Sequence, residues 1–216
     1  MIIWFASGNK HKKEELQDIL SLELKIPSDA GLAFNPDENG NSFLENAMIK
    51  ARELHKLLTQ TKKTGIWQQN DLIIADDSGL CVDALGGRPG IHSARYGGEN
   101  LSAAEKNALL LKELGGNSNR SARFVCAMVL YCDEDRFFTA QECLEGELVK
   151  NAESVRGKGG FGYDPILYIP HIDRTVAELT AKEKNLLSHR GKAGKTISAI
   201  INSVCPQARL DHKPCR

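Results

Sequence analysis

An apolar segment that runs directly into two adjacent aspartates constrains this chain more than any other part of its sequence. Residues 72–75 (LIIA) predict a buried strand, and Asp76-Asp77-Ser78-Gly79 follows at once. We interpret Ser78-Gly79 as the turn that ends the strand, which places both carboxylates at a strand terminus of an α/β protein. Two neighbouring carboxylates are costly there unless a cation compensates them, and a divalent cation can do so. The alternative is that one aspartate caps the turn and the other faces water.

Composition limits the classes of protein that the chain can belong to. Its 216 residues, 41% of them hydrophobic, suffice for one well-buried domain with two lobes. Lys and Arg total 28, as do Asp and Glu, so no basic excess points to nucleic acid or to a membrane surface. No apolar run approaches the roughly 20 residues of a membrane span, and the N-terminus predicts a strand rather than a signal peptide.

The cysteine pattern predicts reduced thiols in a cytoplasmic protein. No pair has the C-x-x-C spacing of a zinc site, and most of the six lie in apolar segments. They are Cys81, Cys126, Cys132, Cys143, Cys205 and Cys215.

Strand and helix signals alternate along the chain and predict an α/β fold with a mixed sheet. Capping-box patterns predict helices that begin at Ser42, Ser102 and Thr180, each with a glutamate three residues later. Other helices are expected over 10–21 and 192–204, and a surface loop over 59–70. Strands are expected over 2–6, 72–75, 122–131, 136–148 and 166–169, of which the third and fourth form a hairpin. Residues 205–216 are expected to be a loose tail.

Two glycine-containing segments carry the clearest binding signals. Residues 7–12 (SGNKHK) join a strand to a helix, where free backbone N–H groups and cations favour an anion, although the P-loop spacing is absent. In residues 157–165, four glycines surround Phe161, an arrangement that suits an aromatic ring stacking on a nucleobase. The alternatives are a strand–helix turn with solvated lysines and a structural loop whose Phe161 fills the core. Lys184, His189 and Arg190 form a cationic cluster in the sequence. The alternative to a binding role is that they lie at a solvated helix end, where cations are favoured.

Six motifs, spread in order over residues 2–204, together resemble the inosine triphosphate pyrophosphatase family. They are residues 7–12 (SGNKHK), 43–47 (FLENA), 75–80 (ADDSGL), 89–96 (PGIHSARY), 160–165 (GFGYDP) and 188–191 (SHRG). The resemblance implies Mg²⁺-dependent hydrolysis of deaminated purine nucleoside triphosphates (ITP, dITP and XTP) to the monophosphate and pyrophosphate. It also implies a homodimer, and an elongated mixed β-sheet flanked by helices, with two lobes around a central substrate cleft. The domain would span residues 1–204.

The resemblance assigns roles to individual residues. Asp77 would be the proton acceptor and a metal ligand, Glu38 a second metal ligand, and Asp76 a possible third. Lys12 and Glu45 would join Asp77 as catalytic residues, and Arg95 is a weaker candidate for the phosphates. The substrate would contact Ser7, Gly8, Asn9, Lys10, His11, Lys12, Ser78, Phe161, Gly162, Tyr163, Asp164, Lys184, His189 and Arg190. Small departures from the family pattern, such as Ser7 for threonine and His92 for tyrosine, leave these roles in place.

Two other functions compete with this assignment. A Maf-type nucleotide pyrophosphatase would share the residue 7–12 turn and the acids, but not the 160–165 and 188–191 motifs. A nucleotide sensor without catalytic activity would bind ITP without turnover, and the presence of Asp77 and Lys12 argues against it.

Overall fold

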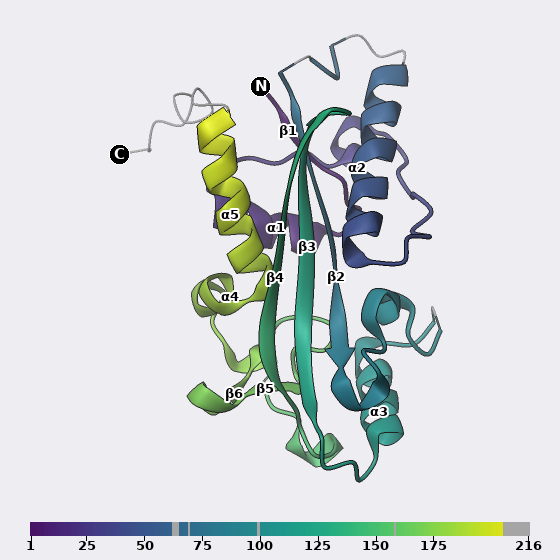
Figure 1. Cartoon of the computed structure of the whole chain (residues 1–216), viewed down its shortest axis with the longest axis vertical. Coiled ribbons are helices and arrows are strands. Elements are labelled where there is room, and N and C mark those ends of the chain that lie inside the picture. Colours follow the sequence, from purple (N-terminus) through teal and green to yellow (C-terminus); the bar gives the residue numbers. More distant parts are fainter. Residues whose placement is uncertain (62–64, 69, 99, 158, 205–216) are drawn as a thin grey trace. The chain divides into compact units, whose positions relative to one another are not determined.

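A mixed six-stranded sheet with helices packed against it forms the framework of the chain (Figure 1). The computed structural model describes residues 1–61, 65–68, 70–98, 100–157 and 159–204. The strands lie in chain order across the sheet: β1 Ile3–Phe5, β2 Leu72–Val82, β3 Ser121–Asp133, β4 Arg136–Leu148, β5 Leu167–Ile169 and β6 Arg174–Thr175. β1 pairs with β2 in parallel, whereas β5 is antiparallel to both β4 and β6. The predicted α/β class with a mixed sheet is confirmed.

Five α-helices accompany the strands within the described residues. They are α1 Lys10–Leu20, α2 Phe43–Gln60, α3 Ala103–Leu114, α4 Ala181–Leu187 and α5 His189–Val204. The predicted caps are present, because the side chains of Ser42, Ser102 and Thr180 each accept a hydrogen bond from the backbone N–H of the glutamate three residues later. No helix in the described part of the chain is long and apolar enough to span a membrane.

The chain divides into two compact units. Unit 1 comprises Met1–Asp77, Ala127–Gln141 and the chain from Arg190 onward, and unit 2 comprises Ser78–Cys126 and Glu142–His189. One division between them falls inside β2, directly after Asp77. Each unit has its own core and is described separately below.

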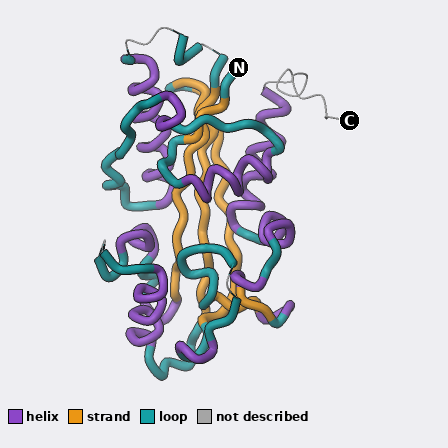
Figure 2. Tube along the Cα trace, turned by 180° about the vertical axis from the view of Figure 1, so that it is seen from behind, coloured by secondary structure: helices purple, strands orange, loops and turns teal. Residues whose placement is uncertain are grey.

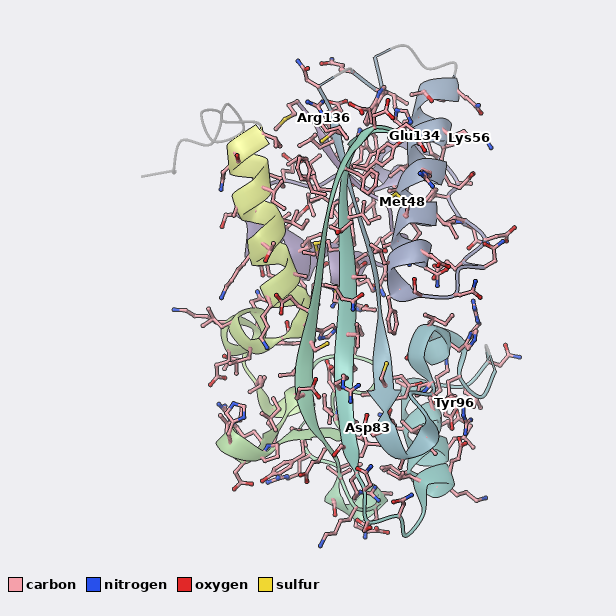
Figure 3. The ribbon with its side chains drawn as sticks, viewed as in Figure 1. Met48, Lys56, Asp83, Tyr96, Glu134 and Arg136 are labelled. Carbon is pink, nitrogen blue, oxygen red and sulfur yellow. The ribbon has the colours of Figure 1, made fainter. Side chains whose placement is uncertain are left out.

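The core of unit 1 lies between its strands and α2. The buried stripe of α2 includes Ala47, Ala51, Leu54 and Leu58, at the spacing of one helix face, and it packs with Trp4, Ala6, Ile73, Ala75, Val129 and Tyr131. In Figure 1 and Figure 2, α2 and α5 lie on opposite sides of the unit 1 strands. Arg52 of α2 pairs with Glu134, in the two-residue turn of the β3–β4 hairpin, at 2.7 Å (Figure 3).

The core of unit 2 gathers around α3 and the segment that follows β4. Leu110, Leu111 and Leu114 of α3 pack with strand residues that include Leu80 and Phe124. Tyr163 and Ile166 join this cluster and thereby anchor the 160–165 segment in the core.

The structure differs from the sequence predictions at four elements. The strand that begins at Leu72 does not end before Ser78-Gly79, because β2 continues to Val82 and keeps Gly79 and Leu80 buried within it. The last helix begins at His189 rather than at residue 192, and β6 was not predicted. Thr59 and Gln60 belong to α2 rather than to a loop.

Other predictions fall partly outside the described residues. Positions 62–64 and 69 of the expected 59–70 loop lie there, as do the whole 205–216 tail and with it Cys205 and Cys215. Of the remaining cysteines, Cys126 and Cys132 are buried and Cys81 and Cys143 are half-buried.

Candidate active site

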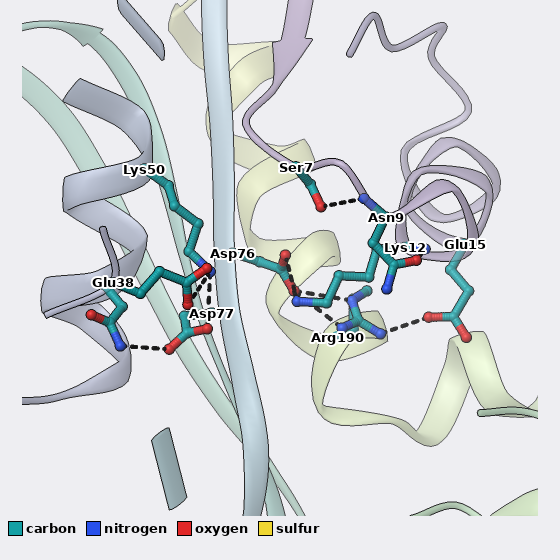
Figure 4. A network of polar contacts seen from close by, with 10 residues as sticks. Ser7, Asn9, Lys12, Glu15, Glu38, Lys50, Asp76, Asp77 and Arg190 are labelled. Carbon is teal, nitrogen blue, oxygen red and sulfur yellow. Dashed lines mark hydrogen bonds and ion pairs between the residues drawn. The ribbon is translucent and has the colours of Figure 1, made fainter. Parts of the chain in front are cut away.

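Asp76 and Asp77 are adjacent in β2, and their carboxylates point to opposite faces of the sheet (Figure 4). This follows from the two-residue period of a strand, which sends successive side chains to opposite sides. Both aspartates are buried, with relative exposures of 1% and 6%. The prediction that they lie at a strand terminus is wrong because β2 continues past them. Each aspartate therefore has its own set of partners.

Asp76 lies between two cations. The Lys12 ammonium is 3.1 Å from both Asp76 oxygens, and the Arg190 guanidinium donates from Nε at 3.2 Å and from Nη2 at 3.1 Å. The third donor of Arg190, Nη1, lies 2.6 Å from Oε2 of Glu15 on α1. Burial raises the pKa of Asp76, but the Lys12 and Arg190 charges outweigh burial and hold this pKa well below its usual range. Asp76 is thus a permanently ionised member of a buried network.

Asp77 faces α2, from which it receives two hydrogen bonds. Lys50 Nζ lies 2.9 Å from Oδ1 of Asp77, and Asn46 Nδ2 donates to Oδ2 at 3.2 Å. The same Lys50 ammonium lies 3.2 Å from Oε2 of Glu38. Burial raises the pKa of Asp77 above its usual value, and Lys50 opposes this shift without cancelling it. Asp77 is therefore the more basic of the two aspartates.

The residue 7–12 turn leads into α1 on the Asp76 side of β2. The Ser7 hydroxyl accepts a hydrogen bond from Asn9 N at 3.1 Å, and Asn9 Oδ1 caps the helix by accepting from Lys12 N at 3.2 Å. Gly8, Asn9, Lys10 and His11 are exposed, and a Cβ on Gly8 would have nothing within 4 Å. An exposed helix N-terminus with this composition can receive an anion through its N–H groups.

The carboxylates on the Asp77 face are suitable ligands for Mg²⁺. Glu38 and Asp77 already share one cationic group, the Lys50 ammonium, and their oxygens are the hard donors that Mg²⁺ prefers. Among the residues that the structure describes, no three His, Cys, Asp or Glu side chains are grouped as a metal site. Mg²⁺ commonly takes one or two carboxylates and completes its shell with phosphate oxygens and water. Glu38 and Asp77 therefore fit a metal that is held jointly with a substrate.

In unit 2, Asp164 organises the predicted base-binding segment. Its Oδ2 accepts from Phe161 N at 2.8 Å and from Lys184 Nζ at 2.9 Å, and the Lys184 ammonium lies 4.5 Å from the centroid of the Phe161 ring. A Cβ on Gly160 would lie 2.1 Å from the same Asp164 oxygen, so only glycine fits there. Phe161 is half-buried rather than enclosed in the core. The segment thus presents an aromatic ring and a cation together.

Further contacts hold this segment in place. The Tyr163 hydroxyl donates to the carbonyl of Ser93 at 2.9 Å, and Asn107 Nδ2 donates to the carbonyl of Gly162 at 3.1 Å. The imidazole of His189 stacks on Phe124, with ring centroids 4.9 Å apart and an interplanar angle of 18°. Segments distant in sequence therefore hold Gly162 and Tyr163, the two residues that follow Phe161.

The predicted site residues fall into two groups. Residues 7–12, Glu38, Asp76, Asp77 and Arg190 belong to unit 1, whereas Ser78, 161–164, Lys184 and His189 belong to unit 2. Lys184, His189 and Arg190 are all buried, which excludes the alternative of a solvated helix end. Ser78 is half-buried in β2.

Two candidates have local partners. Glu45 is exposed, and its Oε2 accepts from Asn41 N at 2.7 Å at the start of α2. It therefore bonds to the residue before the N-cap Ser42, rather than to the N-cap N–H that a capping box would use. Arg95 is exposed, and its Nε donates to Nδ1 of His92 at 3.3 Å within the helical turn Gly90–Arg95.

Three residues at the site were missed from the sequence: Glu15, Asn46 and Lys50. The last two carry a readable signal, because they lie in the buried stripe of α2 beside Ala47 and Ala51. A lysine and an asparagine on an otherwise apolar helix face indicate buried polar partners.

Comparisons with known proteins identify the family of the chain. The sequence profile of the Ham1 family matches residues 3–200. The chain is 47% identical over 205 residues to a dITP/XTP pyrophosphatase of Treponema denticola, covering 93% of this chain and 98% of that protein. A second dITP/XTP pyrophosphatase, from Leptospira biflexa, is 41% identical over 192 residues, with coverages of 88% and 90%.

Solved structures show the same similarity. The Ham1 protein of Staphylococcus aureus matches with a TM-score of 0.80 at 35% identity, over 94% of this chain and all of that one. A HAM1 protein from Coxiella burnetii matches with a TM-score of 0.78 at 38% identity and the same coverage. The resemblance inferred from the six sequence motifs is thereby confirmed, and this chain belongs to the Ham1 family.

Proposed function

We propose that this chain is a Mg²⁺-dependent nucleoside triphosphate pyrophosphohydrolase that converts ITP, dITP and XTP to the monophosphate and pyrophosphate. The relatives named dITP/XTP pyrophosphatase support the reaction and the substrate class. The observation that carries the proposal is the buried Asp77 carboxylate with Lys50 and Glu38 beside it. Removal of such nucleotides from the precursor pool would prevent their incorporation into DNA and RNA.

We assign the triphosphate to groups of unit 1. The free N–H groups of residues 7–12 and the positive end of α1 would bind phosphate oxygens, with Lys12 as the nearby cation. The Lys12 ammonium would interact with both Asp76 and the phosphates, since its side chain is 15% exposed and can be reached by a ligand. When bound by Glu38 and Asp77, Mg²⁺ would neutralise charge on the phosphate chain.

We assign proton transfer to Asp77. Lys50 and Asn46 bond to this buried carboxylate and orient it, as a general base requires. Asp77 would take a proton from the water whose oxygen bonds to the α-phosphorus. The bond from that phosphorus to the bridging oxygen breaks, and pyrophosphate leaves with the electron pair. The Lys50 ammonium would hold the Asp77 carboxylate in orientation during this transfer.

We assign the base to groups of unit 2. Phe161 would stack on the purine, and the Lys184 ammonium would donate to the 6-oxo group of hypoxanthine or xanthine. Adenine presents an amino donor at that position, and one unsatisfied buried group costs about 1–3 kcal/mol, or roughly 10- to 100-fold in selectivity. Asp164, Tyr163, Gly162 and His189 would support this contact. Arg190 remains a proposed donor to the base, although it lies in unit 1 and is engaged by Asp76 and Glu15.

The broader organisation is also proposed from the family resemblance. The family profile spans both units, which supports one pyrophosphatase domain over residues 1–204. We propose a cytoplasmic homodimer, and sedimentation equilibrium of the purified chain would measure its mass directly.

Pyrophosphate release tests the proposed function. Purified protein with Mg²⁺ is given ITP, XTP, GTP or ATP at equal concentration, and fast release from ITP and XTP alone is expected. Asp77→Asn should abolish release while ITP binding stays measurable, and Asp37→Asn, an exposed aspartate beside Glu38, should behave as wild type. Tight ITP binding by wild-type protein without release would instead identify a nucleotide sensor.

A further inference from the structure

The side chain of Asn46 ties the turn that carries Glu38 to Asp77 through two hydrogen bonds. Its Oδ1 accepts from Gly40 N at 2.8 Å, and its Nδ2 donates to Oδ2 of Asp77 at 3.2 Å. Gly40 N is a donor and the Asp77 carboxylate is an acceptor, so the amide can satisfy both in only one orientation. Asn46 has no exposed surface, and an unpaired amide there would be costly. Its two hydrogen bonds thus join two separate parts of the candidate site.

The backbone of the turn is shaped around this amide. A Cβ on Gly40 would lie 2.8 Å from Asn46 Oδ1 and 2.7 Å from the Cβ of Glu45. Only a glycine lets the chain approach Asn46 closely enough for the Gly40 hydrogen bond. Glu38, two residues earlier, is one-third exposed and also meets the Lys50 ammonium, which lies one helical turn after Asn46 on α2. Asn46 and Lys50 therefore both link the turn of residues 38–40 to Asp77, and both lie on one face of α2.

We infer that Asn46 is a positioning residue that fixes the Glu38 turn relative to the Asp77 carboxylate, so that both acids face one substrate phosphate. The inference rests on the proposed function and adds to it a residue that acts through the Glu38 turn and the Asp77 carboxylate. Partners of this kind, when removed, commonly lower activity by about 10- to 100-fold. The loss should fall on kcat, since the groups assigned to the base and to the phosphate anchor are unchanged.

Three substitutions separate the two hydrogen bonds. Asn46→Asp keeps an acceptor for Gly40 N and loses the donor to Asp77, whereas Asn46→Ala loses both. Gly40→Ala pushes the turn away and leaves Asn46 in contact with Asp77. The control is Gln17→Glu, the same amide-to-acid change at a half-buried residue of unit 1 that accepts from Leu24 N at 3.2 Å.

Two readouts decide the inference: kcat and KM for ITP, and hydrogen exchange at the Gly40 amide. All three substitutions should lower kcat about 10- to 100-fold with little change in KM, and Gln17→Glu should not. Exchange at Gly40 should speed up about 3- to 10-fold in Asn46→Ala and stay slow in Asn46→Asp. The kcat of the double variant Gly40→Ala/Asn46→Ala should be no lower than that of the slower single variant. Both substitutions break the same hydrogen bond, from Gly40 N to Asn46 Oδ1, so their effects should not add.

Several results would overturn the inference. One is an unchanged kcat in Asn46→Ala, and another is additive losses in the double variant. If the buried substitutions at Asn46 prevent folding, as judged by circular dichroism, a wild-type kcat in Gly40→Ala would have the same meaning. A wild-type protein that releases no pyrophosphate would overturn the proposed function, and Gly40 exchange in Asn46→Ala would still decide whether the link exists.

Discussion

The ammonium of Lys50 lies 2.9 Å from Oδ1 of Asp77, and both side chains are almost wholly buried. Burial by itself lowers the pKa of Lys50, but Asp77, Asp76 and Glu38 reverse this shift and raise it. Lys50 is therefore charged at neutral pH, and it balances the two carboxylates, Glu38 and Asp77, that we also propose as metal ligands. The protein supplies its own cation on each face of β2.

Replacing Lys50 tests that balance. Lys50→Met keeps most of the side-chain volume and removes the charge, so Asp77 loses its strongest donor. We expect kcat for ITP to fall about 10- to 100-fold, the effect of one hydrogen bond to a charged group. Lys56→Met is the control, since Lys56 lies on the same helix with an exposed side chain (Figure 3). Equal rates in the two variants would contradict the role given to Lys50.

The ion pairs of Asp76 should contribute mainly to stability. Asp76→Ala leaves the Lys12 and Arg190 charges without their shared anion, and breaking a buried pair in this way costs about 3–5 kcal/mol. Urea unfolding followed by circular dichroism measures the loss. Arg52→Ala, which breaks the exposed pair with Glu134, should cost no more than about 1 kcal/mol. Similar costs for both variants would show that Asp76 is not a structural centre of unit 1.

The two glycines that flank Phe161 allow a matched comparison. Both have positive φ, 72° for Gly160 and 63° for Gly162, but only at Gly160 would a Cβ meet the Asp164 carboxylate. Gly162→Ala should cost about 1 kcal/mol of stability from backbone strain alone. Gly160→Ala should also displace Asp164 and raise KM for ITP about tenfold or more, as expected for one charge-assisted hydrogen bond. Steady-state kinetics on both variants would refute this if their KM values agreed.

The capping glutamate of α4 should give stability a distinctive pH dependence. The Arg174 guanidinium, 2.8 Å from Glu183, and the Thr180 cap lower the pKa of Glu183 from 4.5 to about 2. A depressed pKa means that this contribution is complete above the unfolded value and is lost as pH falls toward the folded value. The Tm gap between wild type and Glu183→Gln should therefore be widest near neutral pH and narrow between about pH 5 and pH 3.

Glu105 provides the control for this pH effect. It closes the same kind of capping box on α3, but its pKa is lowered only by hydrogen bonds from Ser102. The Tm gap for Glu105→Gln should thus be smaller and vary less with pH. A gap for Glu183→Gln that stays constant from neutral to acidic pH would contradict the assignment to Arg174.

Much of the fold could be read from local patterns. The capping boxes fixed three helix starts to the residue, because Ser or Thr followed by Glu satisfies the first N–H groups locally. The end of β2 could not be read in this way. Ser78-Gly79 has the composition of a turn, yet pairing within the sheet and burial of Leu80 and Val82 extend the strand through it. The alternating apolar residues at 80 and 82 were the available signal.

The sequence named the acidic residues of the candidate site, but it did not show which cation each of them meets. The family resemblance proposed Asp77, Glu38 and Lys12 as site residues, and the structure places Asp77 and Glu38 on the same ammonium group, that of Lys50. Which acid meets which cation depends on contacts as remote in sequence as Arg190 with Glu15, which lie 175 residues apart. Spacing along the chain carries no information about such contacts, and a strand misread as ending at Ala75 concealed the opposite orientations of its two aspartates.

Because Asp76 and Asp77 point to opposite faces of the sheet, the proposed chemistry depends on the register in which β2 pairs with its neighbour. β2 is held against β1 with Leu72 opposite Ile3 and Ile74 opposite Phe5. A slip by one residue would carry each aspartate to the other face, and a slip in one direction would put Asp77 in the place of Asp76 beside Lys12 and Ser78 in the place of Asp77 beside Lys50. The composition of the strand would be unchanged, while the aspartate proposed for proton transfer would lie on the wrong face of the sheet. A single-residue insertion just before Asp76 should thus be more harmful than a two-residue one, which restores the original parity.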